Sequence, residues 1–170
     1  MCRPIVCGDG WLEGTEFCDW PLGVAGDGCS DACVHDDTCA APIDLAAFAT
    51  LEGTTLVYRG NNRGSDDRLR PGCIPAAAAG GGGDVLFTYT APASGTLRVT
   101  TVDPIDVFDT VVYVRDSCSG ADLACNDDTA MGVLPSTLTL PVVLGQTVLL
   151  VVDGYGAANR GSFALRVTLE

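Results

Sequence analysis

The chain has 170 residues, nine cysteines and a formal net charge of −13, and all nine of its basic side chains are arginine. A surface this acidic repels phosphate groups and argues against nucleic-acid binding. Without lysine there is no Schiff-base nucleophile and no phosphate-loop lysine.

The cysteines divide the chain into two parts. Five of them lie in the first 38 residues and four in the remaining 132. Disulfides in an oxidising compartment explain this density better than zinc, because His35 is the single histidine. We expect a secreted or cell-surface protein with a cysteine-rich module in residues 1–36 and a second domain in residues 37–170.

The start of the chain shows no secretory leader, because Cys2 follows Met1 directly without an apolar segment. We therefore expect a mature fragment with an added start. The longest strongly apolar stretch, Val148 to Val152, is too short to cross a bilayer, so membrane insertion is not expected.

The second domain has the pattern of an all-β fold. Short segments rich in Val, Leu, Thr, Tyr and Phe are separated by clusters of Gly, Pro, Asp and Asn. Several of them alternate between apolar and polar residues, which predicts one buried and one wet face. We expect a two-sheet β-sandwich or jelly roll. The predicted strands cover residues 54–58, 84–90, 96–102, 109–115, 136–143, 146–153 and 162–169.

Two other segments of this domain differ from that pattern. Residues 43–51 are the one stretch that suggests a short helix. The Ala- and Gly-rich run at residues 76–83 predicts a mobile surface loop.

The first module resembles a known repeat family. Its motifs are Cys7-Gly8-Asp9-Gly10, Glu16-Phe17-Cys18-Asp19 and Gly26-Asp27-Gly28-Cys29-Ser30, followed by Cys33. They are similar to the myxococcal-type cysteine-rich disulfide repeat of bacterial surface and secreted proteins, over about residues 7–33. Trp20-Pro21 departs from the family's pattern. Cys2-Arg3-Pro4 resembles the tail of a preceding repeat, which implies that Cys2 is left without a partner.

The second domain resembles bacterial pre-peptidase C-terminal domains. This family consists of β-sandwich modules attached to secreted proteases and to non-enzymatic surface proteins, so the resemblance implies an accessory module. The ordered set of fragments that carries it is Asp37-Thr38-Cys39, Asp84 to Phe87, Ala91 to Gly95, Phe108 to Arg115, Ala124 to Asp128, Gly145-Gln146-Thr147 and Val152 to Gly156.

Segregation by module also predicts the disulfides. Without Cys2 the count in each module is even. We expect bridges Cys39–Cys73 and Cys118–Cys125 in the sandwich. In the first module Cys7, Cys18, Cys29 and Cys33 pair among themselves, and three connectivities are open.

The acidic residues predict a calcium site in the sandwich. The chain has eighteen Asp and four Glu, and many of the Asp flank predicted strands. Carboxylates held close together repel one another unless a cation neutralises them, and oxygen ligands favour Ca²⁺. The alternative is that they cap turns. The candidate ligands are Asp106, Asp109, Asn126, Asp127, Asp128 and Asp153, with Asp103 nearby.

A second cation site is possible in the first module. Asp9, Asp19 and Asp27 lie beside three of its cysteines, and a module with so small a core could use an ion as a staple. Asx turns beside glycine are the alternative explanation.

No catalytic residues are expected. His35 lies in the linker between modules, where we expect it to be exposed, and no nucleophile motif accompanies it. Paired carboxylates of a glycosidase would need a cleft with aromatic walls, and aromatic residues make up only 6% of the chain.

These features together predict a non-catalytic module for adhesion or recognition of a protein or glycan at the cell surface. Tyr155, in a glycine-flanked turn, is the candidate surface residue for binding. One rival is a structural subunit that binds copies of itself in an extracellular fibre or coat. Another is a fragment of a larger secreted hydrolase.

Overall fold

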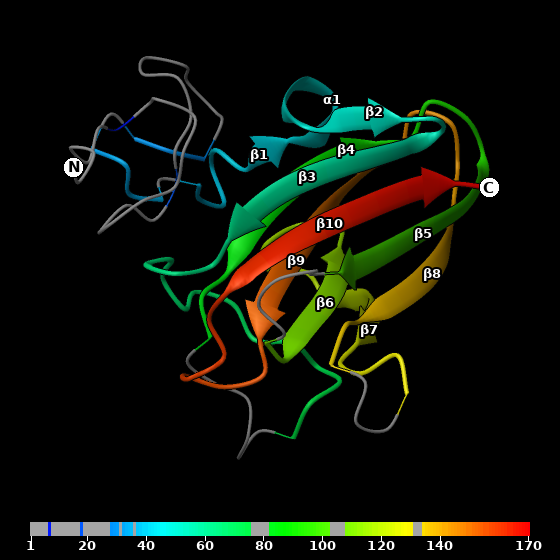
Figure 1. The fold of residues 1–170 in the computed structure, drawn as a ribbon. Helices are drawn as coiled ribbons and strands as arrows, with labels where there is room; N and C mark the ends of the chain where they lie inside the picture. The colour runs from blue at the N-terminus through cyan, green and yellow to red at the C-terminus, as the bar shows by residue number, and fades with distance from the viewer. Residues whose placement is uncertain are drawn as a thin grey trace.

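A computed structural model of the chain describes residues 7, 18, 28–30, 32–35, 37–75, 82–102, 108–130 and 134–170. The second domain is a sandwich of two five-stranded sheets, so the all-β fold class is confirmed (Figure 1). One sheet has the strand order β1-β4-β9-β6-β7 and the other β2-β3-β10-β5-β8. We call them the first and the second sheet.

The first sheet contains four strands that pair antiparallel and one, β1, that runs parallel to β4. Its strands are β1 (Ile43–Asp44), β4 (Val85–Thr90), β9 (Thr147–Gly154), β6 (Thr110–Arg115) and β7 (Asp122–Asn126). The second sheet is antiparallel throughout. Its strands are β2 (Thr50–Glu52), β3 (Thr55–Asn61), β10 (Ser162–Leu169), β5 (Gly95–Val102) and β8 (Thr137–Val142).

All seven predicted strands are present, within a few residues of their expected ends. The short edge strands β1, β2 and β7 were not predicted. The expected helix is a single turn, α1 (Leu45–Phe48), with Asp44 as its N-cap: the Asp44 carboxylate accepts a hydrogen bond from the Ala46 N–H at 2.9 Å. Its neighbours Ile43, Asp44 and Thr50 belong to β1 and β2 instead.

The main core lies between the two sheets. It includes Phe87, Tyr58 and Phe163, whose rings meet edge-on or tilted at centroid distances of 4.8–6.4 Å. A second apolar cluster covers the opposite face of the first sheet, where Leu86, Tyr113 and Val151 pack beneath Leu69 and Ile74. The first sheet is therefore buried on both faces.

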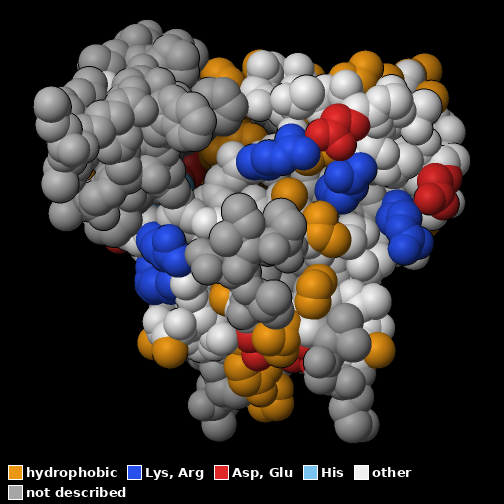
Figure 2. Space-filling view, viewed as in Figure 1, with side chains coloured by type: hydrophobic (Ala, Val, Ile, Leu, Met, Phe, Trp, Pro, Cys, Tyr) orange, Lys and Arg blue, Asp and Glu red, His pale blue; other side chains and the backbone are white. Residues whose placement is uncertain are grey.

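The second sheet leaves its outer face open. Leu165 and Val167 of β10 point into the core, whereas Arg166 and Thr168 between them point outward and are partly exposed. The same alternation places Arg98 of β5 and Arg59 of β3 on the outer face. Figure 2 shows basic side chains gathering across this face.

Four disulfides join eight of the nine cysteines, and two of them correct the prediction. The bridges Cys7–Cys33 and Cys18–Cys29 stay within the first module, as expected. In the sandwich the bridges are Cys39–Cys118 and Cys73–Cys125, not Cys39–Cys73 and Cys118–Cys125. Cys2 lies outside the described residues.

The β6–β7 hairpin explains the corrected pairing. Cys118 lies in the connection between the strands, whereas Cys125 is paired with Tyr113 well inside the ladder. Three residues of strand separate Cys125 from the start of β7 at Asp122, a rise of roughly 10 Å. A disulfide needs Cα atoms within about 7 Å, so Cys118 and Cys125 cannot reach each other along the hairpin.

The two modules are in contact. Gly28 adopts a φ of +83° and lies so close to Ile43 that a Cβ atom there would collide with the Ile43 side chain. Within the first module, Cys29 forms an isolated antiparallel bridge with His35. Whether residues 1–36 form a domain of their own stays a prediction.

Candidate metal centre

Three of the predicted ligands meet at one end of the sandwich. Asp109 precedes β6, and Asp127 and Asp128 follow β7, the strand that pairs with β6. One carboxylate oxygen from each lies within 4.8 Å of the others. Because a Ca²⁺ ion binds oxygen at about 2.3–2.6 Å, two oxygens on one ion can be about 5 Å apart. The spacing of this triad fits one calcium ion.

The triad is short of hydrogen-bond donors. One buried Oδ1 atom of each of Asp109, Asp127 and Asp128 has no hydrogen-bond partner within the described part of the chain. Buried polar atoms are nearly always satisfied in proteins, so three such oxygens in one place call for a ligand. A cation would satisfy all three.

The electrostatics agree with this geometry. Burial, and then the negative charge of Asp128, raise the pKa of Asp109. Burial, and then the charges of Asp109 and Asp128, raise the pKa of Asp127 to about 6. Both shifts arise because ionised carboxylates are desolvated and repel one another here. A bound cation would offset this repulsion and favour the ionised carboxylates.

The loops that carry the triad are held by hydrogen bonds. The Asn126 side-chain amide donates to the Asp128 carbonyl at 3.0 Å, and its oxygen accepts from the Thr137 N–H at 2.8 Å. The Ser136 hydroxyl donates to the Thr110 carbonyl at 2.5 Å and also contacts the Asp127 carbonyl. The side chain of Asn126, predicted as a ligand, therefore orients the loop.

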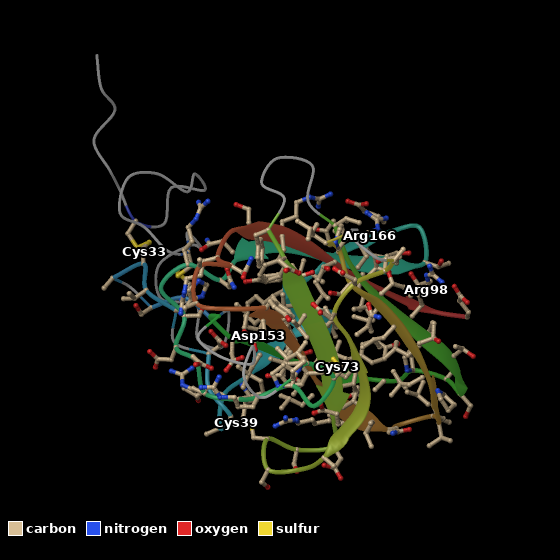
Figure 3. The ribbon with its side chains drawn as sticks, turned by 90° about the horizontal axis from the view of Figure 1, so that it is seen from below. Cys33, Cys39, Cys73, Arg98, Asp153 and Arg166 are labelled. Atoms are coloured by element: carbon tan, nitrogen blue, oxygen red, sulfur yellow. A yellow bond between two sulfur atoms is a disulfide. The ribbon has the colours of Figure 1, made fainter. Side chains whose placement is uncertain are left out.

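Asp153 does not belong to the triad. It is 3% exposed, and its carboxyl group hydrogen-bonds with that of Asp84, which is fully buried. Gly82 packs directly against it, leaving no room for a side chain there. Figure 3 labels Asp153 beside β9.

The Asp84–Asp153 pair holds a proton. The Asp84 carboxylate accepts the N–H groups of Arg68 and Leu69, both at 2.6 Å, and the Tyr113 hydroxyl at 3.3 Å. Within the described part of the chain, Asp153 accepts one N–H, that of the adjacent Gly154, at 2.6 Å. Burial is the first cause that raises the pKa of both carboxyls. Because Asp84 has more donors, we assign the charge to Asp84 and the proton to Asp153.

Asp84, Asp37 and Asn62 are polar groups of the interior that were not among the predicted site residues. The Asp37 carboxylate accepts the Leu86 N–H at 2.8 Å. Asn62, fully buried, donates to the carbonyls of Gly83 and Asn159 and accepts the Gly161 N–H. Asp84 and Asn62 lie beside strands, where Asp and Asn residues are common in turns.

The Gly-rich segment ends in the interior, contrary to the expected surface loop. Gly82 and Gly83 are buried, and the Gly82 carbonyl accepts a hydrogen bond from Arg160 at 3.1 Å. Residues 76–81 lie outside the described residues. So do Asp103 and Asp106 of the first predicted site, and Asp9, Asp19 and Asp27 of the second.

His35 is buried, which corrects its prediction as an exposed linker residue. Its side chain is 4% exposed, and its Nδ1 atom lies 3.8 Å from the carboxylate of Asp37. A β-bridge with Cys29 pairs the backbone of this linker with the first module.

Tyr155 is half-buried and packs against the second apolar cluster. Its backbone N–H donates to the carbonyl of Asp109 at 3.0 Å. The turn that carries Tyr155 is therefore tied to the triad. Tyr113 and Phe108, expected in the core, are fully buried and partly buried respectively.

Comparisons with known proteins find several solved structures whose fold is similar to that of this chain. No family model and no curated protein matches its sequence. A pre-peptidase C-terminal domain of a Bacillus anthracis collagenase aligns with a TM-score of 0.41 and 9% identity, over 72% of this chain and 90% of that one.

Two further structures are similar. An inhibitor of g-type lysozyme from the periplasm of Aeromonas hydrophila has a TM-score of 0.44 and 13% identity, over 71% of this chain and 91% of its own. A family 35 carbohydrate-binding module from Clostridium thermocellum has a TM-score of 0.36 and 13% identity, over 68% and 92%. None of these likenesses assigns the chain to a family or identifies its ligand. In the described residues, no helix has the length and apolar character needed to span a bilayer.

Proposed function

We propose that this chain is a secreted, non-catalytic recognition module whose loops at one end are fixed by one calcium ion. The observation that carries the proposal is the triad of Asp109, Asp127 and Asp128, with three buried oxygens that lack hydrogen-bond partners. The four disulfides support an oxidising, extracellular setting. The resemblance of residues 7–33 to a repeat of bacterial surface proteins agrees with that setting.

Calcium would connect stability to recognition. The ion would supply two positive charges to the triad, which fixes the ends of β6 and β7. The Tyr155 turn is hydrogen-bonded to Asp109, so the same ion would also hold that turn. A ligand bound through Tyr155 would then depend on calcium.

A calcium titration tests the proposal. We expect chelator to lower the melting temperature and millimolar Ca²⁺ to restore it, because a ligand specific for the native state stabilises it by mass action. Asp127→Ala should remove most of this response, whereas Asp116→Ala, at an exposed acid elsewhere, should keep it. Identical melting curves with chelator and with Ca²⁺ would remove calcium from the account.

Binding and turnover are tested separately. Purified protein should adhere to the surface of the cells that secrete it, and Tyr155→Ala should weaken adhesion while leaving the calcium response intact. We expect no hydrolysis of peptide, ester or glycoside substrates. Turnover that Asp127→Asn abolishes, in a folded protein, would contradict the non-catalytic assignment.

A structural subunit of a fibre is the second candidate. Its supporting observation is exposed leucine on two edge strands: Leu51 of β2 is 66% exposed and Leu123 of β7 is 48% exposed. Edge strands with apolar side chains can pair with another copy. Filaments of the purified chain in electron micrographs, lost in Leu51→Lys or Leu123→Lys, would favour this role over recognition.

A further inference from the structure

The outer face of the second sheet carries a row of arginines. Arg59 lies on β3, Arg166 on β10 and Arg98 on β5, three strands that neighbour one another. The register makes the row diagonal, since Arg59 is opposite Ala164, Arg166 is opposite Thr100, and Arg98 is opposite Thr168. One third of the basic residues of a chain with net charge −13 therefore lies on one face.

The space between Arg59 and Arg166, the first interval of the row, already holds a carboxylate. Glu52 of β2 accepts a hydrogen bond from Arg59 at 2.7 Å through one oxygen and from Arg166 at 3.4 Å through the other. Adjacent arginines of this row can thus share one carboxylate. The Glu52 contacts show that the space between two adjacent arginines of the row accepts a carboxylate.

The second interval, between Arg166 and Arg98, holds no acid among the described residues. Arg98 is exposed and makes no hydrogen bond or ion pair in that part of the chain. Thr100 and Thr168 complete the four-residue cell with the two arginines. Glu170, the next outward residue beyond Thr168, makes no ion pair with Arg98. Figure 3 shows Arg98 and Arg166 on the opposite side of the sandwich from Cys39 and Cys73.

The surroundings of this cell are mostly threonine hydroxyl groups, with the buried Val57 beside Arg166 on β3. Arg98 is flanked by Thr168 on one neighbouring strand and Thr139 on the other. Further threonines on the same face are Thr50, Thr55, Thr96 and Thr137. No aromatic side chain lies among the outward residues of these five strands, whereas the buried centre of a protein–protein interface is enriched in aromatic residues. Sugar hydroxyl groups can hydrogen-bond to these threonines, so a sugar suits this face better than the apolar surface of a protein partner does.

We propose that this face binds a carboxylate-bearing polysaccharide, with a uronate carboxylate between Arg98 and Arg166 and the adjoining sugars over the threonines. The inference rests on the recognition role proposed above and adds to it a second binding surface with its ligand class, separate from the Tyr155 turn, which packs on the first sheet. A single exposed ion pair contributes little, so a polymer that makes several contacts at once is the fitting ligand.

The test is binding of short oligogalacturonates at physiological salt, where screening over about 8 Å weakens the effect of distant acids on the protein. We expect Arg98→Gln to weaken binding roughly fivefold, and Arg98→Gln with Arg166→Gln to weaken it further. Arg63→Gln, which removes an exposed arginine away from this face, should have no such effect. Methyl-esterified oligomers, which keep the sugars and lose the charge, should not bind.

Glu52→Gln should change the affinity for oligogalacturonate in the opposite direction. It removes the carboxylate that the chain itself places between Arg59 and Arg166 and opens a second interval to the ligand. We expect it to strengthen oligogalacturonate binding by a few fold. A purely structural role for the row predicts no gain.

Several outcomes would overturn the inference. These are equal losses in Arg98→Gln and Arg63→Gln, equal binding of esterified oligomers, and binding of dextran sulfate or polyphosphate as tight as that of oligogalacturonate. Self-association abolished by Arg98→Gln would assign the face to a second copy instead. If the protein adheres to cells in a Tyr155-dependent way that Arg98→Gln leaves unchanged, this inference fails and the proposed recognition role stands; if it adheres to nothing, the recognition role fails first.

Discussion

The two sheets of the sandwich contribute equally to the core and differ on their outer faces. The first sheet is covered by a second apolar cluster and crossed by two disulfides, and its central strands β4, β9 and β6 are buried on both sides. The second sheet faces outward with threonine and arginine. The difference shows that one sheet of a small domain can have both faces packed while the other keeps an open outer face.

The covering of the first sheet comes from a segment with no secondary structure of its own. Residues 62–75 lie between β3 and β4, and Leu69 and Ile74 from this segment pack on Leu86 and Tyr113. The Cys73–Cys125 bridge joins the segment to β7. Asp84 accepts the N–H groups of Arg68 and Leu69, which satisfies backbone groups that a buried loop would otherwise leave unpaired.

Removal of the Cys73–Cys125 bridge should have the largest effect. The bridge closes a loop of 52 residues in sequence. The loop-entropy model gives a loss of about 4 kcal/mol in the free energy of unfolding when both cysteines become serine. Denaturant unfolding of the double variant measures it, and peptide mapping checks the connectivity. A mapped Cys39–Cys73 bridge would contradict the structure.

Truncation of the covered face should come next. Leu86 is fully buried in the second cluster, so Leu86→Ala should lower the free energy of unfolding by about 2–5 kcal/mol. Thr139→Ala, on the exposed face of the second sheet, should change it by less than about 0.5 kcal/mol. Equal effects in urea denaturation would mean that the two outer faces do not differ.

This contrast could be anticipated only in part from the sequence. The alternation in residues 162–169 predicts one wet face for β10, and the continuous apolar residues of β9 (Val148–Val152) are those of a strand buried on both sides. The strands were therefore predictable. The covering segment was not, because Arg68, Leu69 and Arg70 form no periodic pattern and their position depends on Asp84 and Cys125.

The short edge strands escaped prediction for a different reason. β7 reads Asp-Leu-Ala-Cys-Asn and contains no β-branched or aromatic residue, so its propensity for strand is poor. It forms a strand because its backbone pairs with that of Tyr113 and its neighbours in β6. Tertiary pairing outweighs local preference there.

The candidate metal site could likewise be predicted only in part from the sequence. Asp109, Asp127 and Asp128 were selectable because they flank strands, and pairing of β6 with β7 brings them together. Asp153 lies near the end of β9 and faces Asp84 instead. Position along the sequence gives the end of the sandwich at which an acid lies, but its partner depends on how neighbouring loops pack.

The buried acid pair under the covering segment gives a pH dependence. Burial, and then the charge of Asp84, raise the pKa of Asp153 to about 8, with Asp67 adding to the shift. The folded protein therefore binds a proton that the unfolded chain releases near its ordinary pKa. This contribution to stability is complete below that ordinary value and is lost as pH rises towards about 8, by at most about 1.4 kcal/mol per pH unit.

Asp153→Asn tests this dependence. Asparagine keeps a donor towards Asp84 without an ionisable proton, so the variant should lose less stability than the parent between pH 5 and about 8. Asp116→Asn, which makes the same change of charge at an exposed site, should keep the parent profile. Parallel pH profiles for Asp153→Asn and the parent in thermal melts would show that the pair does not hold the proton.

The smallest effect on stability should come from the open face. Arg98 is exposed and makes no ion pair among the described residues, so Arg98→Gln should change the free energy of unfolding by less than about 0.5 kcal/mol. The melting curve should overlay that of the parent, with and without Ca²⁺, because the triad lies on the other sheet. A larger loss would mean that the arginine row holds the second sheet together, and the face would then resemble the covered one in its role. An unchanged melting curve combined with weakened oligogalacturonate binding would separate recognition on the second sheet from stability on the first.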